Sequence, residues 1–172
     1  MKALLLTIAA LAATFALAIG PGSPYAANGS TVTGAKVAVA GTELGKVLVD
    51  SRGRTLYMFA KDRRGNSSCT GQCAAFWPPL IAAGKPRAVA GAKASLLGTT
   101  KRPDGRLQVT YNHHPLYTFV KDTTKGQTNG EELNAFGAEW YAVTTSGAKL
   151  EKPDATNSDG GYPAAGGYGP GY

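Results

Sequence analysis

The chain has 172 residues, with 18 lysines and arginines against 11 aspartates and glutamates, and a formal net charge of +7. This length accommodates one domain with a modest hydrophobic core once the two ends described below are set aside. The basic residues are dispersed and carry no helix-turn-helix, zinc-finger or RNA-binding signature, so nucleic acid is not an expected partner. A dispersed positive charge favours anionic envelope components such as lipid headgroups, wall polymers or acidic glycans, and ordinary solubility charge is the alternative.

The N-terminal 27 residues have the layout of a secretory signal peptide. Lys2 precedes an uncharged stretch at 3–19, and small and turn-forming residues follow at 20–27. This order predicts export to a periplasmic, envelope-associated or secreted location, with cleavage between 20 and 27 and a flexible lead at 28–34. An uncleaved anchor is the alternative, because the apolar stretch is near the shortest length that spans a bilayer. No other long apolar segment occurs, so no further transmembrane segment is expected.

A sequence repeat is the most informative feature of the chain. Residues 56–62 (LYMFAKD) recur as residues 116–122 (LYTFVKD), with five of seven positions identical at an offset of 60 residues. This identity predicts two copies of one β-rich unit, at about 43–90 and 103–146, within a domain at 35–150.

Each copy of the repeat follows a turn, and each turn follows a β-prone run. The β-prone runs are 46–49 and 107–111, and the turns are 50–54 and 112–115. The order strand, turn, strand predicts a β-hairpin in each half. Further strands are expected at 36–40 and 140–143, and a short helix at 73–77 that ends at two prolines. We therefore predict a mainly antiparallel β domain made of two pseudo-symmetric halves; sandwich, open barrel and propeller-like arrangements all stay open.

Alternation within the repeated strand indicates how the halves pack. Tyr57 and Phe59 share one face of their strand, as do Tyr117 and Phe119, while Leu56, Met58, Leu116 and Thr118 face the other way. We expect the aromatic faces to form the core, and a ligand-facing aromatic cleft is the alternative. Asp62 and Asp122 fall at the strand ends, where each carboxylate is suited to accept hydrogen bonds from turn amides and from the Tyr hydroxyl of its own repeat.

The residues after Pro153 differ in composition from the rest. Gly, Pro, Tyr, Ser and Asp dominate up to Tyr172. A segment without apolar periodicity has little to offset the entropy of ordering, so residues 151–172 are expected to be a disordered tail. The tyrosines of this Gly/Tyr tail suit weak stacking contacts with a partner or another copy, which gives an alternative structural or assembly role.

These motifs resemble the bacterial "secreted repeat of unknown function" family, whose members are predicted envelope lipoproteins. The likeness rests on the doubled motif Tyr57/Phe59/Asp62 and Tyr117/Phe119/Asp122, and on the segments 69–80 and 129–140, and it covers roughly 43–146. The resemblance implies export and a duplicated β fold, and it implies no specific activity. The signal region contains no Cys, so a lipid anchor is not implied.

Cys69 and Cys73 are the only cysteines, and an exported chain meets an oxidising environment. Their spacing suits a disulfide, which stabilises so short a loop by about 2 kcal/mol. Thiol-redox chemistry is the alternative, although a redox pair more usually has two intervening residues.

Metal binding is a further alternative. His113 and His114 are the only histidines, and with Met58 or the thiols they are weak candidates for a copper or zinc site. They lie in a different repeat from the cysteines, and no known ligand spacing joins the two pairs. No metal or other cofactor is therefore expected.

Catalytic signatures are absent from the sequence. No nucleophile elbow, phosphate-binding loop or His-Glu-x-x-His motif occurs. Asp62 and Asp122 facing each other across a pseudo-twofold axis would permit acid–base work, but a duplicated structural cap explains them more simply. Glu131 and Glu132 are expected on a solvated loop. The sequence thus favours a non-enzymatic exported binding module of unknown ligand, with copper or thiol-redox handling and tail-driven assembly as alternatives.

Overall fold

The computed structural model describes residues 34–152. The predicted signal peptide at 1–27, the lead up to residue 33 and the tail from residue 153 lie outside the described residues. Within the described part, no helix has the length and apolar character needed to cross a membrane.

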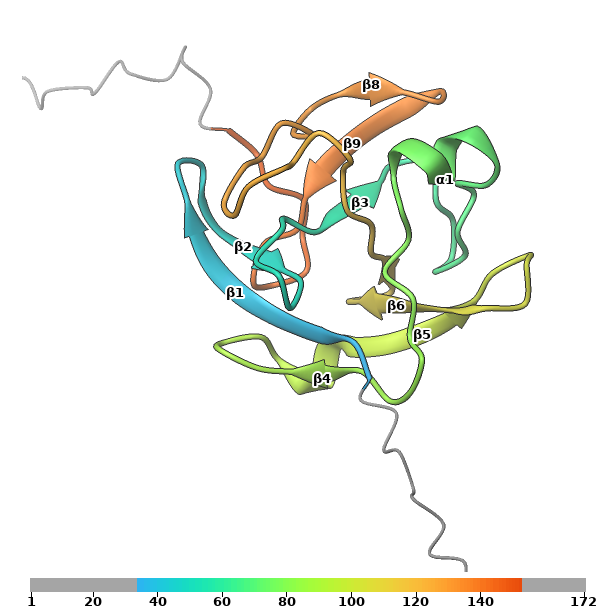
Figure 1. The fold of residues 1–172 in the computed structure, drawn as a ribbon, viewed down its shortest axis with the longest axis horizontal. Helices are drawn as coiled ribbons and strands as arrows, with labels where there is room; N and C mark the ends of the chain where they lie inside the picture. The colour runs from blue at the N-terminus through green and yellow to red at the C-terminus, as the bar shows by residue number, and fades with distance from the viewer. Residues whose placement is uncertain (1–33, 153–172) are drawn as a thin grey trace, which may run out of the picture. The chain divides into compact units, whose positions relative to one another are not determined.

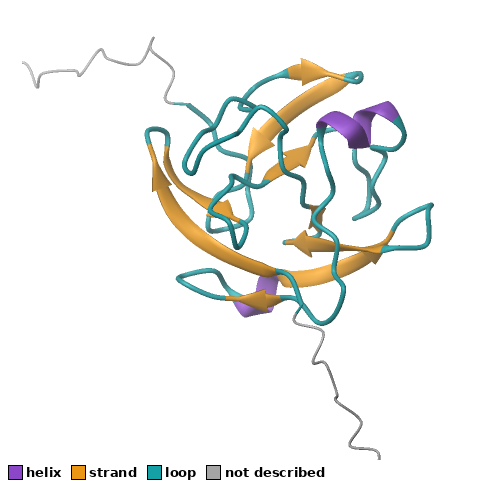
Figure 2. Ribbon diagram, in the orientation of Figure 1, coloured by secondary structure: helices purple, strands orange, loops and turns teal. Residues whose placement is uncertain are grey.

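The fold is mainly β, as the sequence predicts, and one short α-helix interrupts it (Figures 1 and 2). In chain order the elements are β1 (Lys36–Thr42), β2 (Gly45–Val49), β3 (Tyr57–Phe59), α1 (Gln72–Phe76), β4 (Arg87–Ala88), a 3-10 turn (Ala94–Leu96), β5 (Leu97–Lys101), β6 (Leu107–Tyr111), β7 (His114–Pro115), β8 (Asn134–Ala135) and β9 (Ala138–Ala142).

The strands form three small sheets. Their orders are β2-β1-β4, β3-β9-β8 and β5-β6-β7, and every pair is antiparallel except β1 with β4. Figure 1 shows the β8–β9 pair and α1 towards one end of the domain, with β1, β4 and β5 towards the other. The β8–β9 and α1 end carries the candidate site described below.

The two repeats meet at their tyrosines. Tyr57 N–H donates to the carbonyl of Tyr117 at 2.8 Å, and Tyr117 N–H donates to the carbonyl of Tyr57 at 3.0 Å. This reciprocal bridge relates equivalent residues of the two copies, so it marks a local pseudo-twofold axis through the middle of the domain.

The predicted hairpins are present but shorter than expected. In the first half, β2 is joined to the chain after its turn by a single bridge, Val49 with Thr55, and β3 then pairs with β9. In the second half, β6 pairs with β7 over only two residues. The repeated strands leave their hairpins early because Tyr57 and Tyr117 use their backbone groups to pair with each other.

The alternation of side chains divides the core into two clusters. Tyr57, Phe59, Tyr117 and Phe119 lie in one cluster together with Trp77 and Trp140, which we call the aromatic core. Leu56, Met58 and Leu116 lie in a second, mainly aliphatic cluster. The expected packing of the two halves on their aromatic faces is therefore present.

Candidate functional site

A stack of four rings occupies the middle of the aromatic core. The ring centroids are 4.1 Å apart for Phe59–Trp140, 3.9 Å for Trp140–Trp77 and 4.2 Å for Trp77–Phe119. Each repeat contributes one Trp and one Phe, and all four side chains are at most 5% exposed. These rings are core residues, so a ligand-facing cleft built from both repeated Phe residues is not formed, and Phe119 only borders the groove described below.

The repeated tyrosines are hydrogen-bonded across the two halves. The Tyr57 hydroxyl donates to Asp122 Oδ2 at 2.6 Å, and the Tyr117 hydroxyl donates to Asp62 Oδ2 at 2.7 Å. The expectation that each Tyr uses the Asp of its own repeat is therefore wrong. Residues five apart on an extended strand are roughly 16 Å apart, whereas the Tyr57–Tyr117 bridge brings each Tyr towards the loop of the other repeat.

The two aspartates also hold the loops that follow them. Asp62 Oδ1 accepts from the Ser68 N–H at 2.7 Å, and Asp122 Oδ1 accepts from the Asn129 N–H at 3.0 Å. Burial raises the pKa of both carboxyl groups. Burial also raises the pKa of the Tyr57 and Tyr117 hydroxyls. Each carboxylate is thus engaged in structural hydrogen bonds on both oxygens, which is an arrangement for holding loops rather than for proton transfer.

Cys69 and Cys73 form the predicted disulfide, with their Cα atoms 5.3 Å apart. Both are buried beside the aromatic core, and Cys73 lies within α1. The Trp77 N–H donates to the Cys73 carbonyl at 2.8 Å. The disulfide therefore fixes the short helix that presents Phe76 outward and Trp77 inward.

The two histidines belong to the second repeat, at the turn between β6 and β7. His113 sits in the β6–β7 turn with a positive φ of 65°, and His114 belongs to β7. Partial burial of His114 lowers its pKa. Across residues 34–152, no three His, Cys, Asp or Glu side chains are grouped so that they could hold a metal ion.

Glu131 departs from the sequence expectation. It is only 8% exposed, and its Oε2 accepts from the Ala142 N–H at 2.6 Å while Oε1 has no hydrogen-bond partner. Burial raises its pKa. The predicted solvated position is wrong for Glu131 because it is needed to satisfy the amide of a buried strand. Glu132 is exposed, as expected, and pairs with Lys152.

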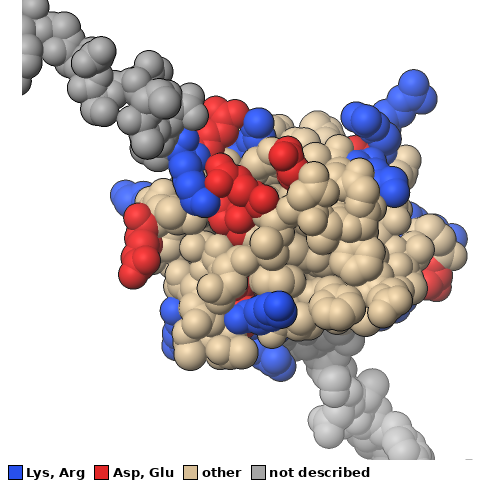
Figure 3. Space-filling model, turned by 90° about the horizontal axis from the view of Figure 1, so that it is seen from above, with Lys and Arg blue, Asp and Glu red and all other residues tan. Residues whose placement is uncertain are grey.

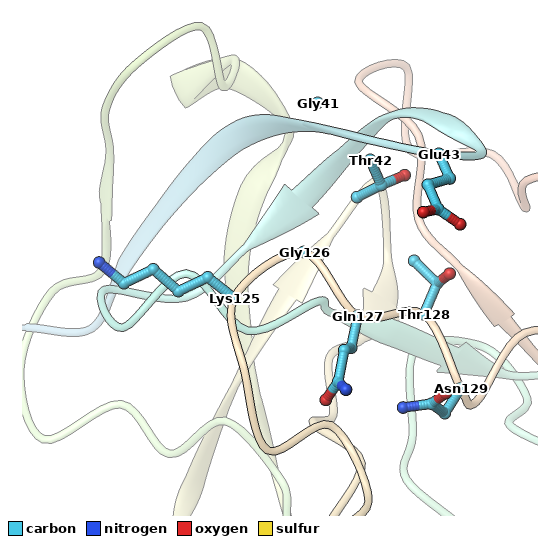
Figure 4. Close-up of a pocket in the computed structure, with 8 residues that line it drawn as sticks. All are labelled: Gly41, Thr42, Glu43, Lys125, Gly126, Gln127, Thr128 and Asn129. Atoms are coloured by element: carbon cyan, nitrogen blue, oxygen red, sulfur yellow. The ribbon is translucent and has the colours of Figure 1, made fainter.

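One surface hollow of the described structure is polar. It has a volume of about 640 Å³ and lies between the β1–β2 turn and the loop at 125–129 (Figure 4). Gln127 Oε1 accepts from the N–H groups of Thr123 and Thr124, and Asn129 Nδ2 donates to the Lys121 carbonyl. The side-chain amides of Gln127 and Asn129 are therefore already hydrogen-bonded within the loop that lines this hollow.

A smaller hollow of about 260 Å³ has an apolar lining, and we call it the Phe76–Phe136 groove. It is lined by Phe76, Trp77, Phe119, Lys121, Leu133, Ala135 and Phe136. Phe76, Leu133 and Phe136 are 41%, 38% and 40% exposed, and the two Phe rings are 6.0 Å apart. Trp77 and Phe119 are buried, so the groove reaches the edge of the aromatic core.

Lysines flank this groove from both repeats. Lys121 lines it, and Lys61 Nζ donates to the Phe136 carbonyl at 3.3 Å. Figure 3 shows the face seen from above, where a broad uncharged area is bordered by both basic and acidic side chains. The groove thus combines apolar walls with one lysine from each repeat at its rim, while Glu132 beside Leu133 is paired with Lys152.

Phe76 and Phe136 are not among the residues predicted from the sequence, although the sequence contains a signal for them. The offset of 60 that relates the repeated motifs also relates Phe76 to Phe136 and Lys61 to Lys121. The correspondence is obscured in the sequence because Trp77 follows Phe76 directly, whereas Trp140 lies four residues after Phe136.

The comparison with protein families places this duplication in context. The family model described as a secreted repeat of unknown function matches residues 38–81 and 98–144, one segment in each half. No curated protein and no solved structure gives a significant match. The description of the family supports the predicted export. Because the two matched segments make up more than half of the chain, the protein belongs to the family of secreted repeats of unknown function.

Proposed function

We propose that this protein is a non-enzymatic exported binding module that holds its ligand in the Phe76–Phe136 groove. The observation that carries the proposal is the duplicated pair of exposed phenylalanines, which lie side by side although the fold leaves about two fifths of each exposed. Contiguous exposed apolar surface with a polar rim is typical of binding sites. Burial of that surface by a ligand is favourable by about 25 cal/mol per Å².

The rim of the groove favours a particular ligand chemistry. Lys61 and Lys121 are both exposed, and neither forms a salt bridge in the described structure. A ligand that places an apolar group between the Phe rings would bring an attached anionic group near these ammonium groups. We therefore propose an anionic amphiphile of the cell envelope, with an apolar part for the groove and an acidic head for the rim.

Several features support a binding role over catalysis. The hydroxyls of Tyr57 and Tyr117 and the carboxylates of Asp62 and Asp122 are used in hydrogen bonds that hold the two halves together. The two cysteines are joined in a disulfide. The groove itself is lined by apolar side chains and one lysine, which suit contact rather than bond breaking.

The test is a fluorescence titration with 1-anilinonaphthalene-8-sulfonate, an aromatic anion, on chain recovered after export. The Phe76→Ser/Phe136→Ser variant is expected to lose at least tenfold in affinity for this probe. Leu107→Ser is the matched control, because Leu107 is 47% exposed but does not line the groove. Equal affinity in the double Phe variant and the parent chain would remove the basis of the proposed function.

The role of charge is tested separately with vesicles. Lys61→Gln/Lys121→Gln is expected to reduce binding to phosphatidylglycerol vesicles, while Lys46→Gln, at another exposed position, leaves it unchanged. Binding that is as strong to phosphatidylcholine vesicles, or insensitive to salt, would contradict an anionic headgroup at the rim.

A further inference from the structure

We propose that residues 153–172 of this chain occupy the Phe76–Phe136 groove of the same molecule and compete there with the external ligand. This inference rests on the proposed function and adds a regulator to the same site.

The described chain ends beside one wall of the groove. The Leu150 N–H donates to the Ala142 carbonyl of β9 at 2.7 Å, and Leu150 is buried. Two residues later, Lys152 Nζ forms a 2.8 Å ion pair with Glu132 Oε2. Glu132 directly precedes Leu133, which lines the groove. The chain therefore leaves its last described contact one residue away from a groove residue.

The segment that follows is long enough to reach the groove. Tyr162 lies ten residues after Lys152, a length that spans up to about 35 Å when extended. A Gly-rich chain of this length has a typical end-to-end distance of about 17 Å. A tether of this kind gives an effective concentration in the millimolar range, so weak contacts are sufficient for substantial occupancy.

The chemistry of the segment complements the groove. Residues 153–172 contain three tyrosines and two aspartates and no lysine or arginine, in a chain whose net charge is +7. Tyrosine rings match the aromatic walls formed by Phe76 and Phe136. The aspartates, Asp154 and Asp159, match the lysines at the rim. The segment therefore has the same two features, apolar rings and negative charge, that the groove favours in an external ligand.

Occupancy by this segment has a measurable consequence. An external ligand would bind only the fraction of molecules whose groove is free, so its apparent affinity is reduced by that fraction. Removal of the segment is then expected to tighten binding without altering the groove.

The experiment compares the full chain, a chain truncated after Lys152, and a full chain with Tyr162→Ser, Tyr168→Ser and Tyr172→Ser. Each is titrated with 1-anilinonaphthalene-8-sulfonate, and Thr156→Ala serves as a control within the same segment. Both the truncation and the triple substitution are expected to raise probe affinity roughly threefold to tenfold, as for a groove free in a tenth to a third of the molecules. Thr156→Ala is expected to leave the affinity unchanged.

The outcomes separate this inference from the function on which it rests. If the full and truncated chains bind the probe equally, and Phe76→Ser/Phe136→Ser still abolishes binding, occupancy by the segment is wrong and the groove function stands. If the double Phe substitution changes nothing in the truncated chain, the groove function itself fails. If the full chain binds the probe as tightly as the truncated chain once it is diluted, the groove is filled by the segment of a second copy and not by that of the same molecule.

Discussion

In the aromatic core, the ring centroids of Trp77 and Trp140 are 3.9 Å apart, and both side chains are at most 1% exposed. The ring centroids of the neighbouring Phe76 and Phe136 are 6.0 Å apart, and these residues are 41% and 40% exposed. Each of the two pairs consists of one residue from the first repeat and one from the second. The core pair is flanked on both sides by further rings, and the exposed pair borders a groove and two lysines. Duplication thus supplies both pairs of aromatic residues, and burial separates those that stabilise the fold from those available to a ligand.

The largest effect on stability is expected in the centre of the ring stack. Trp140→Ala is expected to lower the free energy of unfolding by about 3–5 kcal/mol, because Trp140 contacts Phe59, Trp77 and Tyr117 and is fully buried. Urea unfolding followed by circular dichroism measures the change. An unfolding midpoint equal to that of the parent chain would show that the stack is not the stabilising centre.

The cross-repeat hydrogen bonds are expected to have the next largest effect. Tyr117→Phe removes the hydroxyl that donates to Asp62, and a buried carboxylate then loses a partner, at a cost of about 1–3 kcal/mol. By pseudo-symmetry, Tyr57→Phe is expected to cost a similar amount. Tyr141→Phe is the control, because its hydroxyl pairs with Glu139 at the surface. If Tyr57→Phe and Tyr117→Phe unfold with the same free energy as the parent chain, the cross-repeat pairs contribute nothing to stability.

The disulfide is expected to contribute about 2 kcal/mol, since it closes a very short loop. The Cys69→Ser/Cys73→Ser variant should therefore unfold at a lower urea concentration while keeping the far-ultraviolet spectrum of the parent chain. Because the disulfide holds α1, this variant should also bind the groove probe more weakly. Unchanged probe binding would show that the helix keeps Phe76 in place without the bridge.

The smallest expected effect is a pH dependence from Glu131. Burial raises its folded-state pKa above the ordinary value of 4.5, so its stabilising contribution is complete below that value and is lost as the pH rises through the folded pKa. Glu131→Gln removes the ionisable group. The stability of the variant relative to the parent chain is therefore expected to increase as the pH rises from about 4 to about 7.

Melting temperatures of both chains at the two pH values measure this difference. Asp62 and Asp122 act in the same direction as Glu131, and His114 acts in the opposite direction, so only the difference between variant and parent isolates Glu131. If the difference in melting temperature between the variant and the parent chain is the same at both pH values, the buried Glu131 carboxyl does not cause the pH dependence.

Much of the centre was predictable from local pattern. The period of two in the repeated strand places Tyr57 and Phe59 on one face and Leu56 and Met58 on the other, and the structure puts these sets in separate clusters. The spacing of Cys69 and Cys73 was likewise sufficient to predict their disulfide. In these cases neighbours in the sequence are also neighbours in space.

The remaining features depend on contacts between distant segments. Whether Tyr117 bonds to Asp62 or to Asp122 is decided by how the two halves cross, and strand periodicity contains no information on this. Glu131 resembles an ordinary loop residue until β9 brings the Ala142 amide against it. The walls of the groove come from α1 and from the segment around β8, so its formation likewise depends on how distant segments pack.

Nuclear magnetic resonance gives the sharpest test of whether the ligand binds in the Phe76–Phe136 groove. Amide shifts of the ¹⁵N-labelled chain would be followed during titration with 1-anilinonaphthalene-8-sulfonate. The largest changes are expected to cluster in the segments 76–77, 119–121 and 133–136, which contain the residues that line the groove. Changes centred on 41–43 and 125–129, around the polar hollow, would contradict binding in the groove and would place the ligand in that hollow.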